Sequence, residues 1–331
     1  MADLRTTYMG LSLKNPVVPS ASPLSREISN IKAMEDAGAA AVVLYSLFEE
    51  QVGLEADELE HLATRGAQSL ADASGYFPAQ LDYTRDPDEY VEHVRKAKEA
   101  VDIPIIASMN GISKGGWLEY SKKIEEAGAD GLELNIYFIP TTSRLFGLDV
   151  ETIYLDILKS VKKRVDIPVA VKLSPFFSAL PNFADRLADA GADGLVLFNR
   201  FYQPDIDVDH GDVLSNLTLS TPDDLRLPLR WIAILFGEVE TSLALTSGVH
   251  SADDVLKAVM AGADVANVCS VLLKEGVGKI SELVEAVAQR MDQKGIKSIE
   301  GLKGSLSLQS YVEPWAFERA SYLKLLQSYG R

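Results

Sequence analysis

The feature that most constrains the fold is an Ala-Gly-Ala turn that recurs directly before a short apolar run. Four such turns lie at residues 37–39, 127–129, 190–192 and 261–263. A glycine after a helix supplies the backbone conformation that ends it, and a continuous apolar run is typical of a strand buried on both faces. The sequence therefore predicts an α/β fold in which helices alternate with the strands of a parallel sheet.

Eight such strands are predicted along the chain. They span residues 15–21, 41–45, 105–108, 131–135, 169–173, 194–199, 243–246 and 265–269. The predicted helices span residues 28–37, 87–100, 118–127, 150–165, 180–190, 222–235, 251–261, 280–294 and 318–326. The segment Val-Asp-Ile-Pro at 101–104 recurs at 165–168, which indicates repeated strand–helix units. We therefore predict a (β/α)8 TIM barrel formed by a single domain over residues 1–331, with a doubly wound sheet as the alternative.

Two insertions interrupt this alternation. Residues 47–86 after strand 2 and residues 200–219 after strand 6 are too long for ordinary loops of a barrel, and loops of this length tend to be lids or binding loops. The second insertion holds a run of acidic side chains, which is one pattern that metal ligands form. Because an open loop lacks groups that would orient metal ligands, we predict a solvated acidic hairpin there. The residues concerned are Asp205, Asp207, Asp209, His210 and Asp212.

Composition argues against several classes of protein. The net charge is −16 and no basic cluster is present, which argues against a nucleic-acid partner. There is no apolar run of transmembrane length, and the single cysteine, Cys269, fits a reducing compartment, so we expect a cytoplasmic protein without a membrane partner. The four histidines are scattered along the sequence, so no metal is expected.

Polar side chains stand at the carboxyl ends of the central strands, where an α/β barrel keeps its chemistry. They are Ser108, Asn135, Lys172 and Asn199. Lys172 ends an apolar strand, where it would neutralise an electron-rich cofactor, form a Schiff base with a carbonyl substrate, or extend to the rim as an ordinary surface lysine. Asn135 and Asn199 offer donors and acceptors suited to the edge of a planar heterocycle, although asparagine also occurs in turns at strand ends.

Strands 7 and 8 are followed by two loops that predict an anion site. Ser247, Gly248 and Val249 join strand 7 to its helix, and Cys269 and Ser270 follow strand 8. Barrels often bind phosphate at this place with backbone N–H groups. The alternative is an ordinary glycine turn with a serine helix cap, in which Cys269 is a small residue at the edge of the core.

At these residues the chain resembles the dihydroorotate dehydrogenase family, and more distantly the pyrimidine-reducing domain of dihydropyrimidine dehydrogenase. The likeness extends over nearly the whole chain, through the segments 10–18, 21–22, 106–108, 133–135, 171–175, 247–249, 269–270 and 294–299 and through Asn199. The resemblance implies that FMN binds with its phosphate at strands 7 and 8 and its ring near Lys172. It implies these cofactor-binding residues: Ala21, Ser22, Ser46, Ser108, Asn135, Lys172, Asn199, Ser247, Gly248, Val249, Cys269 and Ser270.

The chain departs from the family pattern where substrate and base are expected. Tyr45 stands where the family usually has a lysine at the end of strand 2, and the Asn-rich substrate loop after that strand has no clear counterpart. The family motif Asn-Leu-Ser-Cys-Pro-Asn reads Asn-Ile-Tyr-Phe-Ile-Pro at 135–140, so Phe138 occupies the position of the base and Pro140 that of a substrate-binding asparagine. Tyr137 and Tyr45 are the candidates for a substitute base.

We therefore predict an FMN-dependent oxidoreductase that transfers hydride between a pyrimidine-like C–C bond, of the dihydroorotate type used in UMP biosynthesis, and the flavin. The resemblance assigns the catalytic roles to Lys172, Asn135, Asn199, Tyr137 and Tyr45. We expect slow oxidation of dihydroorotate, a small-molecule pyrimidine-like substrate and a homodimer. Two alternatives stay open: a non-catalytic or partner-dependent flavoprotein that passes electrons to another protein, and a Schiff-base lyase that uses Lys172.

Overall fold

Eight parallel strands form the central sheet of the protein. The computed structural model describes residues 2–53, 87–200, 203–214, 217–312 and 326–327. The strands follow each other around the sheet in the order β3 (Val17–Pro19), β12 (Val265–Val268), β11 (Ser242–Thr246), β8 (Gly194–Leu197), β7 (Val169–Leu173), β6 (Gly131–Asn135), β5 (Ile105–Asn110) and β4 (Val42–Phe48). The Ala40 N–H donates to the Val17 carbonyl oxygen at 3.0 Å, which brings the chain at the start of β4 against β3. The sheet thus closes into a nearly complete barrel, and the predicted (β/α)8 fold is confirmed.

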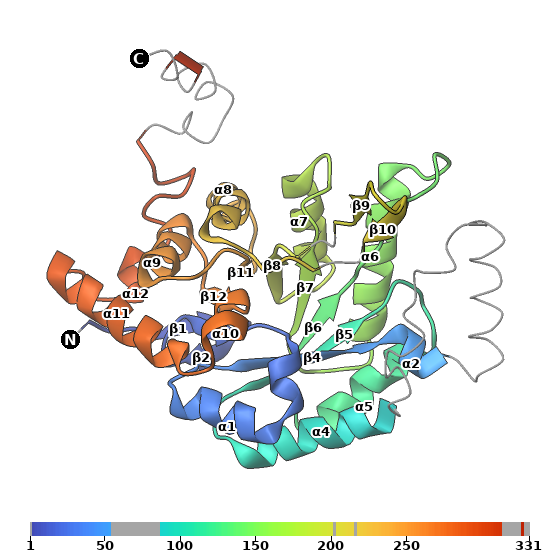
Figure 1. Ribbon diagram of the computed structural model, residues 1–331, viewed down its shortest axis with the longest axis horizontal. Helices are drawn as coiled ribbons and strands as arrows, with labels where there is room; N and C mark the ends of the chain where they lie inside the picture. Colours follow the sequence, from blue (N-terminus) through green and yellow to red (C-terminus); the bar gives the residue numbers. More distant parts are fainter. Residues whose placement is uncertain (1, 54–86, 201–202, 215–216, 313–325, 328–331) are drawn as a thin grey trace.

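Eight main helices surround these strands (Figure 1). They are α1 (Ile28–Asp36), α4 (Pro87–Ala100), α5 (Tyr120–Glu126), α6 (Gly147–Lys162), α7 (Leu180–Asp189), α8 (Arg226–Leu235), α9 (Ala252–Ala261) and α11 (Lys279–Lys294). The short elements are α2 (Glu49–Gly53), α10 (Ser270–Glu275), α12 (Ile299–Leu302) and the 3-10 turns η1 (Pro23–Arg26), η2 (Gly116–Glu119) and η3 (Pro222–Leu225). The glycines of the four Ala-Gly-Ala turns all have positive φ, between 97° and 125°, which only glycine adopts without strain.

The amino end of the barrel is filled by a hairpin that the sequence did not reveal. Strands β1 (Thr6–Tyr8) and β2 (Leu11–Leu13) pair in antiparallel fashion, and Met9 between them is 4% exposed. The Met9 side chain lies so close to Gly194 that a Cβ there would meet its Cγ at 3.0 Å. Buried residues of the hairpin and of the inward faces of the strands form one cluster inside the barrel. The interior is therefore a packed core, and only the carboxyl end remains for ligands.

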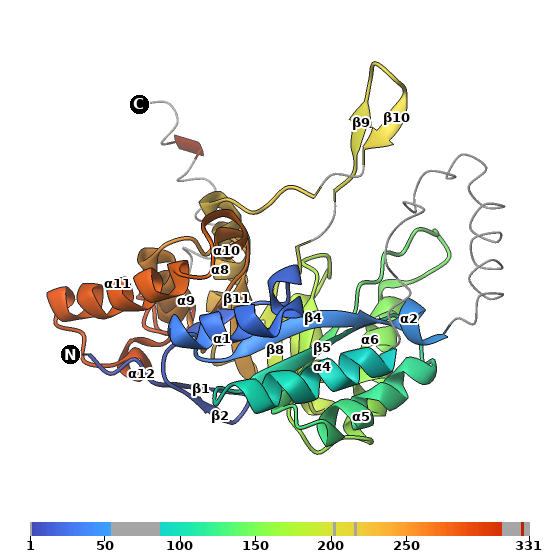
Figure 2. The same cartoon turned by 60° about the horizontal axis from the view of Figure 1, so that its bottom comes forward.

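The two predicted insertions have different outcomes. Strand β4 continues to Phe48 and leads into α2. Residues 54–86 of the first insertion and residues 318–325 of the last predicted helix lie outside the described residues. In the second insertion β9 (Asp205–Asp207) and β10 (Asp212–Leu214) form an antiparallel hairpin that projects from the barrel (Figure 2). The predicted solvated acidic hairpin is thereby confirmed, and Asp207 pairs with His210 at 2.8 Å.

The described residues contain neither a membrane-spanning helix nor a cluster of metal ligands. None of the described helices has the length and apolar character needed to cross a membrane. In the same part of the chain, no three or more His, Cys, Asp or Glu side chains are grouped so that they would hold a metal ion.

Candidate functional site

Two adjoining cavities open at the carboxyl ends of the strands. The first, here called the inner cavity, has a volume of about 350 Å³. It is lined by residues of β4, β7, β11 and β12 and of the loops after β3, β8, β11 and β12. The second, here called the outer cavity, has a volume of about 340 Å³. Phe48 and Asn199 line both cavities, so the two spaces meet at these side chains. A ligand longer than either space has room along this continuous path.

Lys172 lies between the inner cavity and the interior of the barrel. Its Nζ forms an ion pair with Glu133 Oε1 at 3.2 Å and lies 3.5 Å from Ser20 Oγ. Only 7% of the Lys172 side chain and 2% of the Glu133 side chain are exposed. The two residues are on neighbouring parallel strands, β7 and β6. The costly buried lysine expected from the sequence is therefore compensated by a buried carboxylate, which the sequence analysis did not single out.

Asn135 and Asn199 are brought together as the sequence predicted. Asn199 Nδ2 donates to Asn135 Oδ1 at 2.6 Å, and the Asn199 backbone N–H donates to the Leu173 carbonyl at 2.8 Å. With this assignment of the amide atoms, the Asn199 Oδ1 acceptor and the Asn135 NH2 donor group take no part in this bond. Both side chains line the outer cavity. The pair presents complementary groups at the junction of the two cavities.

The loop after β11 has an unusual backbone. Ser247 and Gly248 have φ of 79° and 77°, in the left-handed region. A Cβ on Gly248 would lie 2.2 Å from the Leu225 backbone nitrogen, so only glycine fits between this loop and η3. No backbone hydrogen bond among the described residues uses the Val249 N–H. Since Val249 lines the inner cavity, this donor is available to a ligand there.

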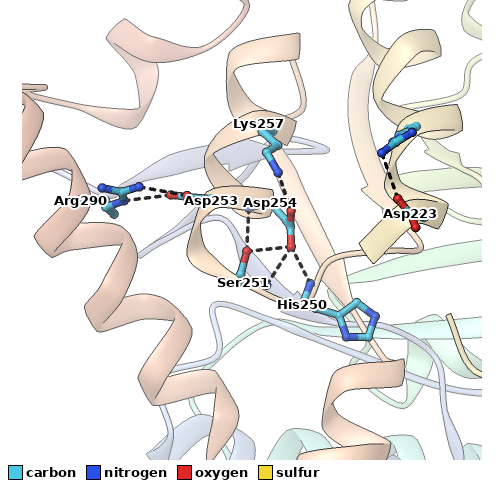
Figure 3. A network of polar contacts seen from close by, with 8 residues as sticks. Asp223, His250, Ser251, Asp253, Asp254, Lys257 and Arg290 are labelled. Atoms are coloured by element: carbon cyan, nitrogen blue, oxygen red, sulfur yellow. Dashed lines mark hydrogen bonds and ion pairs between the residues drawn. The ribbon is translucent and has the colours of Figure 1, made fainter. Parts of the chain in front are cut away.

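A network of polar contacts fixes the start of α9 behind this loop (Figure 3). Asp254 accepts from the backbone N–H groups of His250 and Ser251 and pairs with Lys257 at 2.9 Å. Burial alone would raise the pKa of Asp254, but the hydrogen bonds from Lys257, Ser251 and His250 outweigh burial and hold the pKa below its usual range. The loop before α9 is therefore held from both sides, by α9 and by η3.

Ser220 is a site residue that the sequence analysis missed. It lies at the end of the second insertion, and its backbone N–H donates to Ser270 Oγ at 3.0 Å. Its hydroxyl accepts from the Gly248 N–H at 3.4 Å and lies 3.3 Å from His250 Nε2, while its carbonyl accepts from Lys274 Nζ at 2.9 Å. Burial and the nearby Lys274 lower the pKa of His250. Ser220 thus joins the insertion to the loops after β11 and β12, although no local pattern marks it.

Most of the residues implied as cofactor ligands gather around the inner cavity. The lining includes Ala21, Ser22, Lys172, Asn199, Ser247, Gly248, Val249, Cys269 and Ser270. Ser46 and Ser108 instead bond to each other, with their hydroxyl oxygens 2.8 Å apart. Burial raises the pKa of the Cys269 thiol, and the charge of Lys172 opposes this in part. The thiol therefore has the environment of a neutral lining residue.

An unsatisfied polar atom marks the inner cavity as a ligand site. Asn267 is 2% exposed and lines this cavity, and its Oδ1 is buried without a hydrogen-bond partner among the described residues. A buried acceptor left in this way is costly, and it becomes satisfied when a ligand donates an N–H or O–H to it. Asn267 was also missed by the sequence analysis, because a single asparagine inside an apolar run gives no distinct pattern.

Tyr45 and Tyr137, the candidates for a substitute base, and Phe138, at the expected base position, lie in three different environments. The Tyr45 ring packs edge-on against Tyr90, with centroids 5.1 Å apart, and lies under the Arg26 guanidinium at 5.4 Å. Because Tyr90 belongs to α4, the ring lies between the strand and the surrounding helices, and it lines neither cavity. Tyr137 lines the outer cavity. Phe138 lines a separate groove of about 390 Å³, which Pro140 also lines.

The fold is an α/β barrel with two adjoining cavities at the carboxyl ends of its strands. Residues 3–291 match the family described as dihydroorotate dehydrogenase, and the chain belongs to this family. A relative from Thermoplasma volcanium, named dihydroorotate dehydrogenase B (NAD(+)), catalytic subunit, is 29% identical over an alignment of 311 residues. The alignment covers 92% of this chain and 98% of the relative. A relative of the same name from Listeria innocua is 29% identical over 315 residues, 92% of this chain and 99% of its own length.

Proposed function

We propose that the protein is an FMN-dependent oxidoreductase that acts on a CH–CH bond of a pyrimidine-like ring. The observation that carries this proposal is the inner cavity, which combines a buried cation, an unsatisfied buried acceptor and a backbone donor. FMN offers a matching set of groups: a phosphate, hydroxyls and a planar ring with both donors and acceptors. Family membership supports the same cofactor.

The residues of the inner cavity divide into two groups with different roles. Gly248, Val249, Cys269 and Ser270 would hold the phosphate through backbone N–H groups and the Ser270 hydroxyl. Lys172 would face the electron-rich edge of the ring, and Asn267 would accept a hydrogen bond from the cofactor. Ala21 and Ser22 border the same space from the loop after β3. When bound, FMN supplies the hydride acceptor, and the protein supplies binding and orientation.

The substrate would bind in the outer cavity, next to Asn199. There Asn135 and Asn199 would orient the ring, and Tyr137, which lines the same cavity, would take part in proton transfer. Phe138 has no proton-accepting group and lines a different groove. Because a general base contributes about 10²- to 10⁴-fold to such reactions, we expect dihydroorotate oxidation to be slow unless Tyr137 acts as the base.

A second candidate is a flavoprotein that works with an electron-transfer partner. The relatives are named catalytic subunits of an NAD(+)-dependent enzyme, which points to further subunits in those proteins. A Schiff-base lyase is less well supported, because the reactive amine must be uncharged, whereas Lys172 shares a buried ion pair with Glu133.

The first experiment identifies the cofactor. The protein is purified, or reconstituted with flavins, the chromophore is released by heat, and its mass is measured. We expect FMN in an amount equal to the protein. Release of FAD, or the absence of bound flavin after reconstitution with FMN, would refute the proposal. Borohydride treatment with carbonyl substrates provides the control, because covalent labelling of Lys172 would support the lyase instead.

A further inference from the structure

The outer cavity contains three amide side chains and one carboxylate. The amides are Asn110, Asn135 and Asn199, and the carboxylate is the exposed Glu50. Its described lining includes no lysine or arginine. We infer, on the basis of the function proposed above, that the ring bound here is an uncharged cyclic amide that carries no carboxylate.

The two cations that line the inner cavity, Lys172 and Arg200, and Lys114, which follows Ile112 closely in the sequence, are paired with carboxylates among the described residues. Lys172 pairs with Glu133 at 3.2 Å, Arg200 with Asp224 at 3.0 Å, and Lys114 with Asp156 at 2.8 Å. An anionic substrate would therefore have to compete with an existing partner for each of them. The described lining of the outer cavity offers no cation to a carboxylate on the substrate, and Glu50 would repel that carboxylate.

A second carboxylate lies at the edge of the outer cavity, next to Ile112 of its lining. Glu49, directly before Glu50, accepts from the Ile112 N–H at 2.6 Å and from the Ser113 N–H at 3.1 Å, so a second carboxylate is held at this edge. The two carboxylates at this edge, Glu49 and Glu50, therefore favour an uncharged ligand over an anion.

The asparagine pair supplies a positive reason for a cyclic amide. Asn199 and Asn135 use one donor and one acceptor in their mutual hydrogen bond of 2.6 Å. An acceptor on one side chain and a donor on the other are left over, and exchanging the nitrogen and oxygen of both amides gives the same result. A ring amide offers an N–H and a C=O side by side, which is the complementary arrangement. Recognition of this kind needs no charge on the ligand.

Uracil and orotate provide a matched pair of probes, because they differ only by the carboxylate at ring position 6. Binding of each to the flavin-loaded protein is measured by calorimetry and by the change in the flavin spectrum. We expect uracil to bind at least about tenfold more tightly than orotate, the order of magnitude of one like-charge contact at a partly exposed site. Equal or tighter binding of orotate would overturn the inference, and so would the absence of binding by both.

Reversing the charge of Glu50 tests whether this residue causes the difference between uracil and orotate binding. Glu50→Lys should tighten orotate binding by about tenfold, in a salt-dependent way, while it leaves uracil binding nearly unchanged. Asp209→Lys is the matched control, because it makes the same change of charge at an exposed residue of the β9–β10 hairpin that lines neither cavity. An equal gain in orotate affinity in both variants would show that overall charge, and not the outer cavity, selects the ligand.

The test separates this inference from the proposed function. Calorimetry measures the ratio of uracil to orotate affinity without any redox turnover, and it applies to flavin-free protein too. Failure to bind FMN would refute the proposed function, while the ratio measured on the same sample would still decide the charge of the ligand.

Discussion

Replacing Lys172 by methionine should destabilise the protein strongly, because it leaves the Glu133 carboxylate buried without its counter-charge. The Glu133 side chain is 2% exposed and that of Lys172 is 7% exposed, so solvent hardly screens the pair. Removing one partner of such a pair costs about 3–5 kcal/mol, whereas replacing both by apolar residues is often neutral or stabilising by about 1–4 kcal/mol. The double variant Lys172→Met/Glu133→Leu should therefore be more stable than Lys172→Met.

Urea unfolding of the flavin-free protein measures these differences as shifts of the midpoint at constant slope. Lys163→Met is the matched control, because Lys163 is exposed and forms no ion pair among the described residues. We expect that variant to lie within about 0.5 kcal/mol of the parent protein. A loss below about 1 kcal/mol in Lys172→Met, or additive effects in the double variant, would refute the reasoning that the two charges stabilise each other.

Three further predictions concern the loops around the cavities. Gly248→Ala should prevent FMN binding or lower the free energy of unfolding by more than about 1 kcal/mol, because the new Cβ would lie 2.2 Å from the Leu225 nitrogen. An unchanged flavin affinity together with an unchanged urea midpoint would contradict this. Asp254→Asn should lower stability at neutral pH by about 1–3 kcal/mol. The pKa of Asp254 is depressed in the folded protein, so its carboxylate stabilises the fold above the unfolded pKa of about 4, and this stabilisation is lost as the pH falls through the folded pKa. The difference in unfolding free energy between Asp254→Asn and the parent protein should therefore shrink in acid. A difference that is independent of pH would contradict a stabilising role for the charged carboxylate. Phe138→Cys should leave anaerobic flavin reduction by dihydroorotate unchanged, because position 138 lines a separate groove, and a gain of about tenfold or more would show that the side chain reaches the substrate.

Sequence alone was sufficient where local patterns carry the information. The Ala-Gly-Ala turns and apolar runs specify where helices end and buried strands begin, because glycine is needed at positive φ and parallel strands are apolar on both faces. Strand ends of a parallel barrel meet at one rim, so the order of the strands was enough to bring Asn135 and Asn199 together and to place Lys172 beside the inner cavity.

The direction of single side chains was decided only by the tertiary structure. Strand β4 has one extra residue between Val43 and Ser46 relative to β5, and such a bulge reverses which side chains face inward. Ser46 therefore meets Ser108, and Tyr45 packs against α4 instead of the cavities. Nothing in the local pattern of a strand reports the register of its neighbour.

Contacts between segments that are distant in the sequence could not be predicted from it either. Glu133 is one residue in an apolar run, and its importance appears only when β7 lies beside β6 and Lys172 reaches it. Ser220 reaches the loops after β11 and β12 from the end of a long insertion. The sequence determined the barrel and the rim that holds the site, because the order and type of the helices and strands follow from local sequence patterns. Only the tertiary structure shows the charge balance and the shape of the site, because both depend on contacts between side chains that are far apart in the sequence.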